Sequence, residues 1–477
     1  MAPYLHLNLA TWLFTQLLLL LLLFRNADCG HIVKTLPGFP GELPFKLESG
    51  YIGVEQSELY YIFVESTGHP RTDPLLLYLV GGPGCSGFNG FFYQTGPLAF
   101  NDSHYNGGLP ELYLRPYAWT KTASIIFLDA PVGTGFSYAN DPEGLVVSDT
   151  SSARQTYKFL RKWLAEHPQY MDIRIFIASD SYSGIVAPII VQYILDDNAA
   201  GVKPHLKLIG LISGSPHQGI ELEANAEIEV AYRLGLIGNR LYQRARESCK
   251  GQYFSVDSSN KGCEEALGQI DELLNDIYLE NVLGPKCVTN SPKPDEDETQ
   301  SGRRRIRSLQ GEKARRFSGL SFPQWWCKNS AYALSYAWAN NETVKEALRI
   351  REGTVEKWYR CNLVIEELYN HDIASAFSYQ KNFTKTDLQV LLYTGDHDLV
   401  VPHLATEQWL RALNITTEYS WRPWFVDGQV AGYKIIYQSY SYRLTYLTVK
   451  GSGHSPTEYY NKKSYEMFAR WIHFYPV

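Results

Sequence analysis

Residues 179–184 read Ser-Asp-Ser-Tyr-Ser-Gly, and this stretch decides the fold. It lies between a short run rich in β-branched and aromatic residues, 173–178, and a mostly apolar stretch, 184–195, that is long enough for a helix. This pattern predicts a buried strand, a sharp turn and a helix. A serine at such a turn is held out of the sheet with its hydroxyl exposed, which favours Ser181 as a nucleophile. A Ser/Gly turn without chemistry also fits these residues.

Two later segments repeat the order of a strand followed by polar residues. The apolar run 389–394 leads into Gly-Asp-His-Asp at 395–398, and the run 444–449 leads into Gly-Ser-Gly-His at 451–454. Open α/β sheets place their sites at the carboxyl ends of strands. The chain order Ser, Asp, His is that of α/β-hydrolases and differs from the chymotrypsin and subtilisin orders.

The three segments together predict a catalytic triad of Ser181, Asp398 and His454. Ser181 would attack an ester carbonyl, His454 would take its proton and return it to the leaving group, and Asp398 would fix the imidazole tautomer. Asp398 is preferred because it precedes Leu-Val-Val-Pro at 399–402, a spacing common in hydrolases. Asp396 remains the alternative acid. The N–H of Tyr182, which follows the nucleophile, is expected to be one oxyanion donor.

Further motifs give the chain a family resemblance. They are Gly-Gly-Pro-Gly-Cys-Ser at 81–86, Asp-Ala-Pro-Val-Gly-Thr-Gly-Phe-Ser-Tyr at 129–138, the turn at 180–182, and the segments that contain Asp398 and His454. Over roughly residues 35 to 477 they resemble the plant serine carboxypeptidase-like family. The resemblance implies an α/β-hydrolase fold, with a mostly parallel central sheet and a helical cap, and makes the N–H of Gly82 the second oxyanion donor. A plain tight turn at these glycines is compatible with that role.

Three positions beside the triad depart from the carboxypeptidases of the family. Those enzymes hold a peptide carboxylate with an Asn before the paired glycines, a Glu about a dozen residues later and a Glu before the nucleophile. Here the positions are Val80, Gln94 and Asp180, and with Gly81 they are expected to line the substrate site. Losing a hydrogen bond to an ionised group costs roughly 1.5–3 kcal/mol, so three changes should cripple carboxylate recognition.

The same positions resemble the acyltransferase branch of the family. That resemblance implies transfer of an acyl group from a 1-O-β-glucose ester, through a Ser181 acyl-enzyme, to an alcohol or amine acceptor. Two alternatives stay open: a serine carboxypeptidase that releases C-terminal residues from peptides, and a catalytically inactive binding protein. No cofactor is expected.

The pattern of apolar segments divides the chain into four parts. Residues 1–29 contain an apolar block and small residues before a cleavage position, which predicts a secretory signal peptide. Residues 30–219 and 386–477 alternate strands and helices and form the expected core, with strands at 75–80, 124–128, 173–178 and 207–212 and helices at 150–167 and around 464–474. Residues 220–385 read as a helical cap insertion, with helices at 221–236 and 263–283.

Within the expected cap, residues 290–318 stand apart as an acidic block followed by an arginine cluster with hardly an apolar residue. Such a segment cannot bury enough surface to offset its ordering entropy, so it is predicted to be a flexible, protease-prone linker. Members of the family are often cut here, which implies two disulfide-linked chains from one precursor.

Cysteines and sequons agree with a secretory route. Seven cysteines become six if cleavage follows Cys29, and an even count in a secreted chain indicates disulfides. Cys249 and Cys263 lie close enough for a local loop, and the resemblance pairs Cys85 with Cys361 and Cys287 with Cys327. Glycosylation is expected at four sequon asparagines: Asn101, Asn341, Asn382 and Asn414.

Composition excludes other classes of protein. The net charge of −6 gives no electrostatic case for nucleic-acid binding. The cysteine and histidine spacings lack the patterns of metal sites, so no metal is expected. After signal removal, no apolar run approaches the roughly 20 residues of a membrane-spanning helix. The mature protein is expected in the vacuole or outside the cell.

Overall fold

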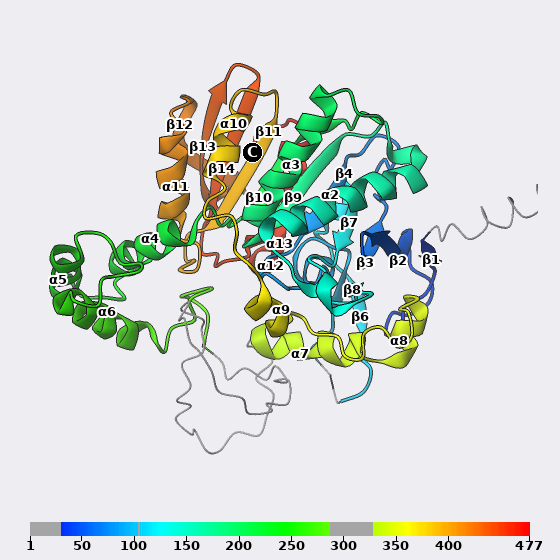
Figure 1. The fold of residues 1–477 in the computed structure, drawn as a ribbon, viewed down its shortest axis with the longest axis horizontal. Helices are drawn as coiled ribbons and strands as arrows, with labels where there is room; N and C mark the ends of the chain where they lie inside the picture. Colours follow the sequence, from blue (N-terminus) through cyan, green and yellow to red (C-terminus); the bar gives the residue numbers. More distant parts are fainter. Residues whose placement is uncertain (1–29, 104, 106, 287–327) are drawn as a thin grey trace, which may run out of the picture.

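The structure is a computed structural model that describes residues 30–103, 105, 107–286 and 328–477. Its main element is a 12-stranded sheet whose central strands are parallel (Figure 1). In spatial order these are β7 (Ser124–Leu128), β4 (Leu75–Leu79), β9 (Ile175–Asp180), β10 (Leu208–Gly214), β11 (Gln389–Gly395) and β14 (Tyr442–Val449). Because they are parallel, their carboxyl ends meet at one edge of the sheet, where ligand sites form.

Antiparallel strands extend the sheet on both sides. Beyond β7 lie β3 (Ser57–Val64), β2 (Leu47–Val54) and β1 (His31–Val33), and beyond β14 lie β13 (Gln429–Ser439) and β12 (Thr416–Val426). The short β8 (Tyr138–Ala139) pairs with β3, and β5 (Leu98–Phe100) and β6 (Leu112–Leu114) form a separate pair. None of these antiparallel strands was predicted from the sequence.

Alternate residues of the central strands belong to two hydrophobic cores on opposite faces of the sheet. In β4, Leu75, Leu77 and Leu79 belong to one buried cluster, whereas Leu76 and Tyr78 belong to the other. This alternation follows from the two-residue repeat of a strand. It explains why the central strands read as continuous apolar runs rather than as an alternating pattern.

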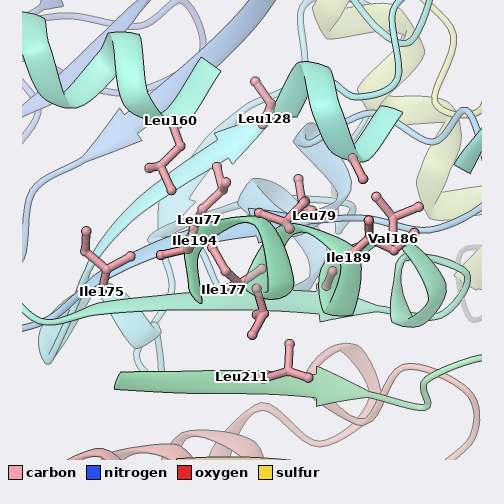
Figure 2. Packing of buried hydrophobic residues seen from close by; sticks show 14 of the residues in the cluster. Leu77, Leu79, Leu128, Leu160, Ile175, Ile177, Val186, Ile189, Ile194 and Leu211 are labelled. Atoms are coloured by element: carbon pink, nitrogen blue, oxygen red, sulfur yellow. The ribbon is translucent and has the colours of Figure 1, made fainter. Parts of the chain in front are cut away.

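Helices cover both faces. One face is packed by α2 (Asp149–Glu166), α3 (Ser183–Ala199), α10 (Phe377–Phe383) and α11 (His403–Ala412), and the other by α13 (Asn461–Ile472) and α7 (Lys328–Ala339). Figure 2 shows Val186, Ile189 and Ile194 of α3 lying against the leucines and isoleucines of β4 and β9. At roughly 1.5–3 kcal/mol for each fully buried large apolar side chain, this packing holds α3 firmly on the sheet.

The helix α2 begins with a capping box. The Ser148 side chain accepts from the Ser151 N–H, and the Ser151 hydroxyl accepts from the Ser148 N–H. Its apolar stripe, which includes Phe159 and Trp163, is buried against the sheet, as the helical spacing predicts.

The strands and helices expected in the core are present, with shifted ends. The strands expected at 173–178 and 207–212 lie at Ile175–Asp180 and Leu208–Gly214. Both end two residues later than expected, because their parallel pairing continues up to the turn that leads to the site. The helix expected at 150–167 lies at Asp149–Glu166, and the last helix lies at Asn461–Ile472.

The described part of residues 220–385 is helical. It comprises α4 (Ile220–Arg233), α5 (Asn239–Cys249), α6 (Lys261–Leu274), α7, α8 (Glu342–Ala347), α9 (Leu363–Leu368) and α10. Figure 1 shows α5 and α6 extending away from the sheet. The helix expected at 263–283 is wrong in length, since α6 ends at Leu274 and the chain beyond it bonds to loops of the core.

Shorter helices complete the described chain. They are the π-helix η1 (Gly90–Gln94), the 3-10 helices η2 (Trp119–Lys121), η3 (Pro142–Leu145) and η4 (Pro168–Tyr170), and α12 (Pro456–Tyr459). Within the described residues, no helix is both long enough and apolar enough to cross a membrane.

Two disulfides lie in the described residues. Cys249 and Cys263 link α5 to α6, and Cys85 and Cys361 join the glycine-rich loop after β4 to the segment before α9. The third expected pair, Cys287 with Cys327, lies outside the described residues, as do the expected signal peptide 1–29 and the linker 290–318. Among the sequon asparagines, Asn382 and Asn414 are exposed, and Asn101 and Asn341 are half-buried.

Candidate active site

Ser181 occupies a strained turn between β9 and α3. Its φ is +60°, a left-handed conformation that is unfavourable for a residue with a side chain. Two backbone hydrogen bonds hold it there: its N–H donates to the Gly214 carbonyl at 2.9 Å, and its carbonyl accepts from the His217 N–H at 3.1 Å. A Cβ at Gly184 would lie 2.6 Å from Pro216 Cβ, so only glycine permits this close packing.

The structure brings Ser181, His454 and Asp398 together. His454 Nε2 lies 2.7 Å from Ser181 Oγ, and His454 Nδ1 lies 2.8 Å from Asp398 Oδ2. Asp398 is fully buried, and its other oxygen accepts from the N–H groups of Val400 and Val401. This arrangement can activate a serine hydroxyl and hold the imidazole in the required tautomer.

Asp396, the alternative acid, has different partners. Its Oδ1 lies 2.7 Å from His397 Nδ1 and accepts from the Gly451 N–H at 2.7 Å. These bonds tie the loop after β11 to the loop after β14. The geometry therefore favours Asp398 over Asp396 as the partner of His454.

A strap of chain that follows α6, residues 278–284, holds both of these loops. The Leu399 N–H donates to the Leu279 carbonyl at 2.9 Å, and the His454 N–H donates to the Glu280 carbonyl at 2.6 Å. A Cβ at Gly453 would lie 2.1 Å from that Glu280 carbonyl oxygen. The helical insertion thus contacts the triad directly. Because the chain after Leu274 reaches these loops, α6 does not continue to residue 283 as expected.

The expected oxyanion donors belong to two loops that meet at Ser181. Tyr182 is the N-cap residue of α3, and Gly82 has a φ of +114° in the loop after β4. Among the described residues, neither of their N–H groups donates a hydrogen bond. A Cβ at Gly81 would lie 2.6 Å from the Tyr182 nitrogen and 2.7 Å from Ser181 Cβ, so glycine is required for the two loops to meet.

Asp129 organises the loop that contains Gly82. It is fully buried, and one oxygen accepts from Ser86 Oγ and from the Gly87 N–H, both at 2.7 Å. Its other oxygen accepts from the Phe136 N–H at 2.7 Å. The motif at 129–138 therefore shapes the glycine loop rather than contacting the triad.

Asp180, which precedes the nucleophile, accepts hydrogen bonds at one oxygen, whereas its Oδ1 is buried without a partner among the described residues. Gln94 Nε2 donates to Asp180 Oδ2 at 2.9 Å, Ser455 Oγ donates to the same oxygen at 2.9 Å, and Tyr78 donates to Gln94 Oε1 at 2.9 Å. Asp180 and Gln94 are only 2% and 4% exposed, and Val80 is buried with them. Ser455 and Tyr78 were not predicted, because neither stands in a recognisable motif.

Burial and charge shift two pKa values at the site. Burial raises the pKa of Asp180 to about 6, against the lowering effects of His454, Ser455 and Gln94. Burial alone would lower the pKa of His454, but the charge and hydrogen bond of Asp398, together with Asp180 and Glu280, raise it above its usual value.

The raised pKa of Asp180 predicts a pH dependence of stability. Between pH 3.8 and about 6 the folded protein binds this proton more tightly than the unfolded chain, so the free energy of unfolding falls as pH rises. A pKa difference of this size corresponds to roughly 3 kcal/mol. In urea unfolding, we expect Asp180→Asn to gain stability relative to the parent between pH 4 and pH 7.

The matched control is Asp172→Asn, because the Asp172 side chain is 94% exposed. It should follow the pH dependence of the parent protein. A stability difference between Asp180→Asn and the parent that stays constant over this range would contradict the buried-carboxyl explanation.

A second polar group anchors the Tyr182 side chain. Its hydroxyl donates to Asp149 Oδ1 at 2.7 Å and lies 2.5 Å from His371 Nδ1, while Asp149 Oδ2 accepts from the Ile373 N–H. The hydroxyl proton goes to Asp149, so the Tyr182 oxygen can accept a hydrogen bond from His371 Nδ1. Sequence reasoning missed Asp149 and His371, because each stands in a segment far from Tyr182.

Within the described part of the chain, no group of three or more His, Cys, Asp or Glu side chains could hold a metal ion.

Comparisons with known proteins identify the class to which this fold and site belong. A sequence model of the serine carboxypeptidase family matches residues 37–474. The crystal structure of Kex1(Δ)p, a prohormone-processing carboxypeptidase from Saccharomyces cerevisiae, superposes with a TM-score of 0.72 at 17% identity, covering 93% of this chain and 94% of that one. The chain belongs to the serine carboxypeptidase family, and the predicted α/β-hydrolase fold is confirmed.

Proteins of Arabidopsis thaliana give closer sequence matches. Serine carboxypeptidase-like 16 is 40% identical over 469 residues, which cover 97% of this chain and 99% of that protein. Serine carboxypeptidase-like 12 is 40% identical over 464 residues, covering 96% of this chain and 98% of that protein. The predicted resemblance to serine carboxypeptidase-like proteins is confirmed over nearly the whole chain.

Proposed function

We propose that the protein is a serine carboxypeptidase-like acyltransferase that moves an acyl group from a 1-O-β-glucose ester to an alcohol or amine acceptor. The observation that supports transfer over peptide hydrolysis is the network next to the nucleophile, in which the amide of Gln94 already donates to Asp180. A carboxypeptidase needs donors that are free to hold a substrate carboxylate. At the corresponding positions this chain has an apolar Val80, and Gln94 and Asp180 already bond to each other and to Ser455.

The energetic argument concerns the C-terminal carboxylate of a peptide. Bringing it next to Asp180 would bury it where the amide of Gln94 already donates to Asp180 and where Val80 offers no polar side chain. Burying an unpaired charge is costly, whereas a neutral sugar brings no such penalty. A glucose ester is therefore the better substrate for this site.

The mechanism follows from the distances at Ser181. Ser181 Oγ forms a bond to the acyl carbon while its proton passes to His454 Nε2, 2.7 Å away. The developing oxyanion accepts from the free N–H groups of Gly82 and Tyr182. As the bond to glucose breaks, His454 returns the proton to the leaving oxygen. The acceptor then gives its proton to His454 and attacks the acyl carbon. As the bond to Ser181 Oγ breaks, His454 returns that proton to Ser181.

A direct comparison of the two kinds of substrate should distinguish acyl transfer from release of C-terminal residues. We expect ester or amide product from an aromatic acyl glucose with a panel of alcohols and amines, and little release of C-terminal residues from a blocked dipeptide at acidic pH. Product analysis by liquid chromatography and mass spectrometry makes the comparison. Efficient peptide trimming without transfer to any acceptor would overturn the proposal and favour a carboxypeptidase.

The carboxylate-binding positions provide a gain-of-function test. We expect the triple variant Val80→Asn, Gln94→Glu, Asp180→Glu to gain peptidase activity, because it restores groups able to hold a carboxylate. Each restored charge-assisted bond contributes roughly 1.5–3 kcal/mol, so an increase of at least about tenfold in kcat/KM for the blocked dipeptide is expected. The single variant Val80→Asn is the control, and a triple variant no better than it would count against this explanation of specificity.

We also propose that the chain follows the secretory pathway to the vacuole or the outside of the cell. The disulfides support this, since such bonds persist in oxidising compartments, as do the exposed sequons at Asn382 and Asn414. Glycosidase treatment of the protein from its native tissue should increase its mobility on a gel.

A further inference from the structure

A second histidine lies beside the triad and has no part in the mechanism above. His217 follows β10, and its backbone N–H donates to the Ser181 carbonyl. This bond fixes His217 to the strained turn at Ser181 between β9 and α3, which we call the elbow. Its ring centroid lies 6.4 Å from that of His454 and 6.0 Å from that of Tyr182. The ring therefore stands next to both the base and the residue that offers an oxyanion donor.

His217 is paired with a buried acid. Its Nδ1 lies 3.9 Å from Glu223 Oε2, and within the described residues both atoms are enclosed and have no hydrogen-bond partner. The opposite oxygen of Glu223 accepts from the N–H groups of Gln218 and Gly219, at 2.8 and 3.3 Å. The carboxyl group is thus fixed by the loop that also contains His217.

This separation is longer than a hydrogen bond, but hydrogen bonds at catalytic sites are often long in the absence of substrate. A small rotation of the imidazole would satisfy two buried polar atoms at once. Leaving such atoms unpaired costs about 1–3 kcal/mol each, so the pair favours an Nδ1–H that faces Glu223.

Part of the His217 ring is accessible. The side chain is 16% exposed although Nδ1 is enclosed, and Nε2 makes no hydrogen bond within the described residues. With the proton on Nδ1, Nε2 holds a lone pair and requires a donor from outside the protein. A hydroxyl group supplies that donor.

We propose that His217, oriented by Glu223, accepts a hydrogen bond from a hydroxyl group of a substrate bound beside Ser181. The inference rests on the proposed acyl-transfer function. The hydroxyl belongs either to the glucose of the acyl donor or to the acceptor alcohol. Both share the chemistry that Nε2 recognises, and kinetics distinguishes them.

The test uses His217→Phe, which keeps an aromatic ring and removes the acceptor. Three quantities are measured: kcat/KM for the acyl glucose, kcat/KM for the p-nitrophenyl ester of the same acid, which has no sugar hydroxyl, and the ratio of transfer to hydrolysis at fixed acceptor concentration. If the glucose binds His217, kcat/KM for the acyl glucose falls about tenfold, and kcat/KM for the p-nitrophenyl ester stays within about threefold of the parent value. If the acceptor binds it, the transfer ratio falls about tenfold.

Three further variants distinguish loss of this hydrogen bond from general damage to the site. His217→Gln keeps an oxygen acceptor and should retain at least a third of each parent value, with unchanged labelling of Ser181 by a phosphonate. Glu223→Gln should lower the same kinetic quantity that His217→Phe lowers, because Glu223 orients His217. Glu221→Gln is the matched control, because Glu221 lies on the same helix with an exposed side chain, and it should change nothing.

The proposal is overturned if His217→Phe leaves all three quantities within about threefold of the parent. It is also overturned if both esters lose activity equally while the transfer ratio stays constant, since that pattern indicates general damage to the site. A parent enzyme that gives no transfer product with any acceptor instead contradicts the proposed function, and the comparison of the two esters still tests His217.

Discussion

Ser181→Ala is expected to abolish turnover of both glucose esters and activated esters. Ser181 Oγ, held at the elbow 2.7 Å from His454 Nε2, is the nucleophile in this mechanism. Removing the nucleophile of a triad of this kind can cost about 10⁶ in rate. Steady-state assays with the acyl glucose measure the loss, and circular dichroism checks that the variant is folded.

Covalent labelling supplies the control for that variant. A serine-directed phosphonate should modify Ser181 in the parent, as located by peptide mass spectrometry, and should leave Ser181→Ala unmodified. Ser183 is the neighbouring serine that could be mistaken for the nucleophile, but its hydroxyl donates to the Val80 carbonyl at 2.7 Å. Labelling at another serine, or an active alanine variant, would rule out this mechanism.

Asp398→Asn is expected to lower kcat by about 10⁴, with little change in stability. An amide at this position would offer an N–H to His454 Nδ1, which would place the imidazole proton on Nε2, facing Ser181. The base could then no longer accept the serine proton. Rate measurements across pH give the size of the loss.

Asp396→Asn is the matched variant, because it lies two residues away in the same loop. The amide oxygen still accepts from the Gly451 N–H, so we expect less than about a tenfold change in kcat. Equal losses in the two variants would mean that Asp398 is not specifically the partner of His454. A larger loss at Asp396 would reverse the assignment.

Local patterns sufficed to predict the elbow and the sheet that supports it. The strands that lead to Ser181, Asp398 and His454 are short apolar runs followed by polar residues, and in the structure they are β9, β11 and β14. Each is buried on both faces, which leaves a strong signal in the sequence. The two-residue shift of β9 arose because Ser179 and Asp180 are polar yet continue the strand.

Contacts between distant segments could not be read from the sequence. Gln94 bonds to Asp180, and Tyr182 bonds to Asp149, only because separate loops meet at one edge of the sheet. The choice between Asp398 and Asp396 likewise needed the position of His454. Side-chain partners of this kind depend on tertiary packing, which local spacing does not encode.

The antiparallel extensions β12 and β13 were missed for another physical reason. Most side chains of β12 are exposed and polar or aromatic without a regular alternation, and its pairing with β13 contains several irregularities in register. An edge strand that buries little surface gives a weak apolar pattern. In the order of the sheet, β13 lies beside β14, and β12 forms the edge.

The measurement that tests the central claim most directly is the fate of the acyl-enzyme. Rapid mixing of the parent protein with an acyl glucose, followed by acid quench and intact-mass analysis, should reveal one acyl group, which peptide mapping places on Ser181. Adding the acceptor should accelerate its decay and yield the acylated acceptor in place of free acid. An acyl group that never forms, or one that decays to free acid at the same rate whatever acceptor is present, would contradict acyl transfer through Ser181.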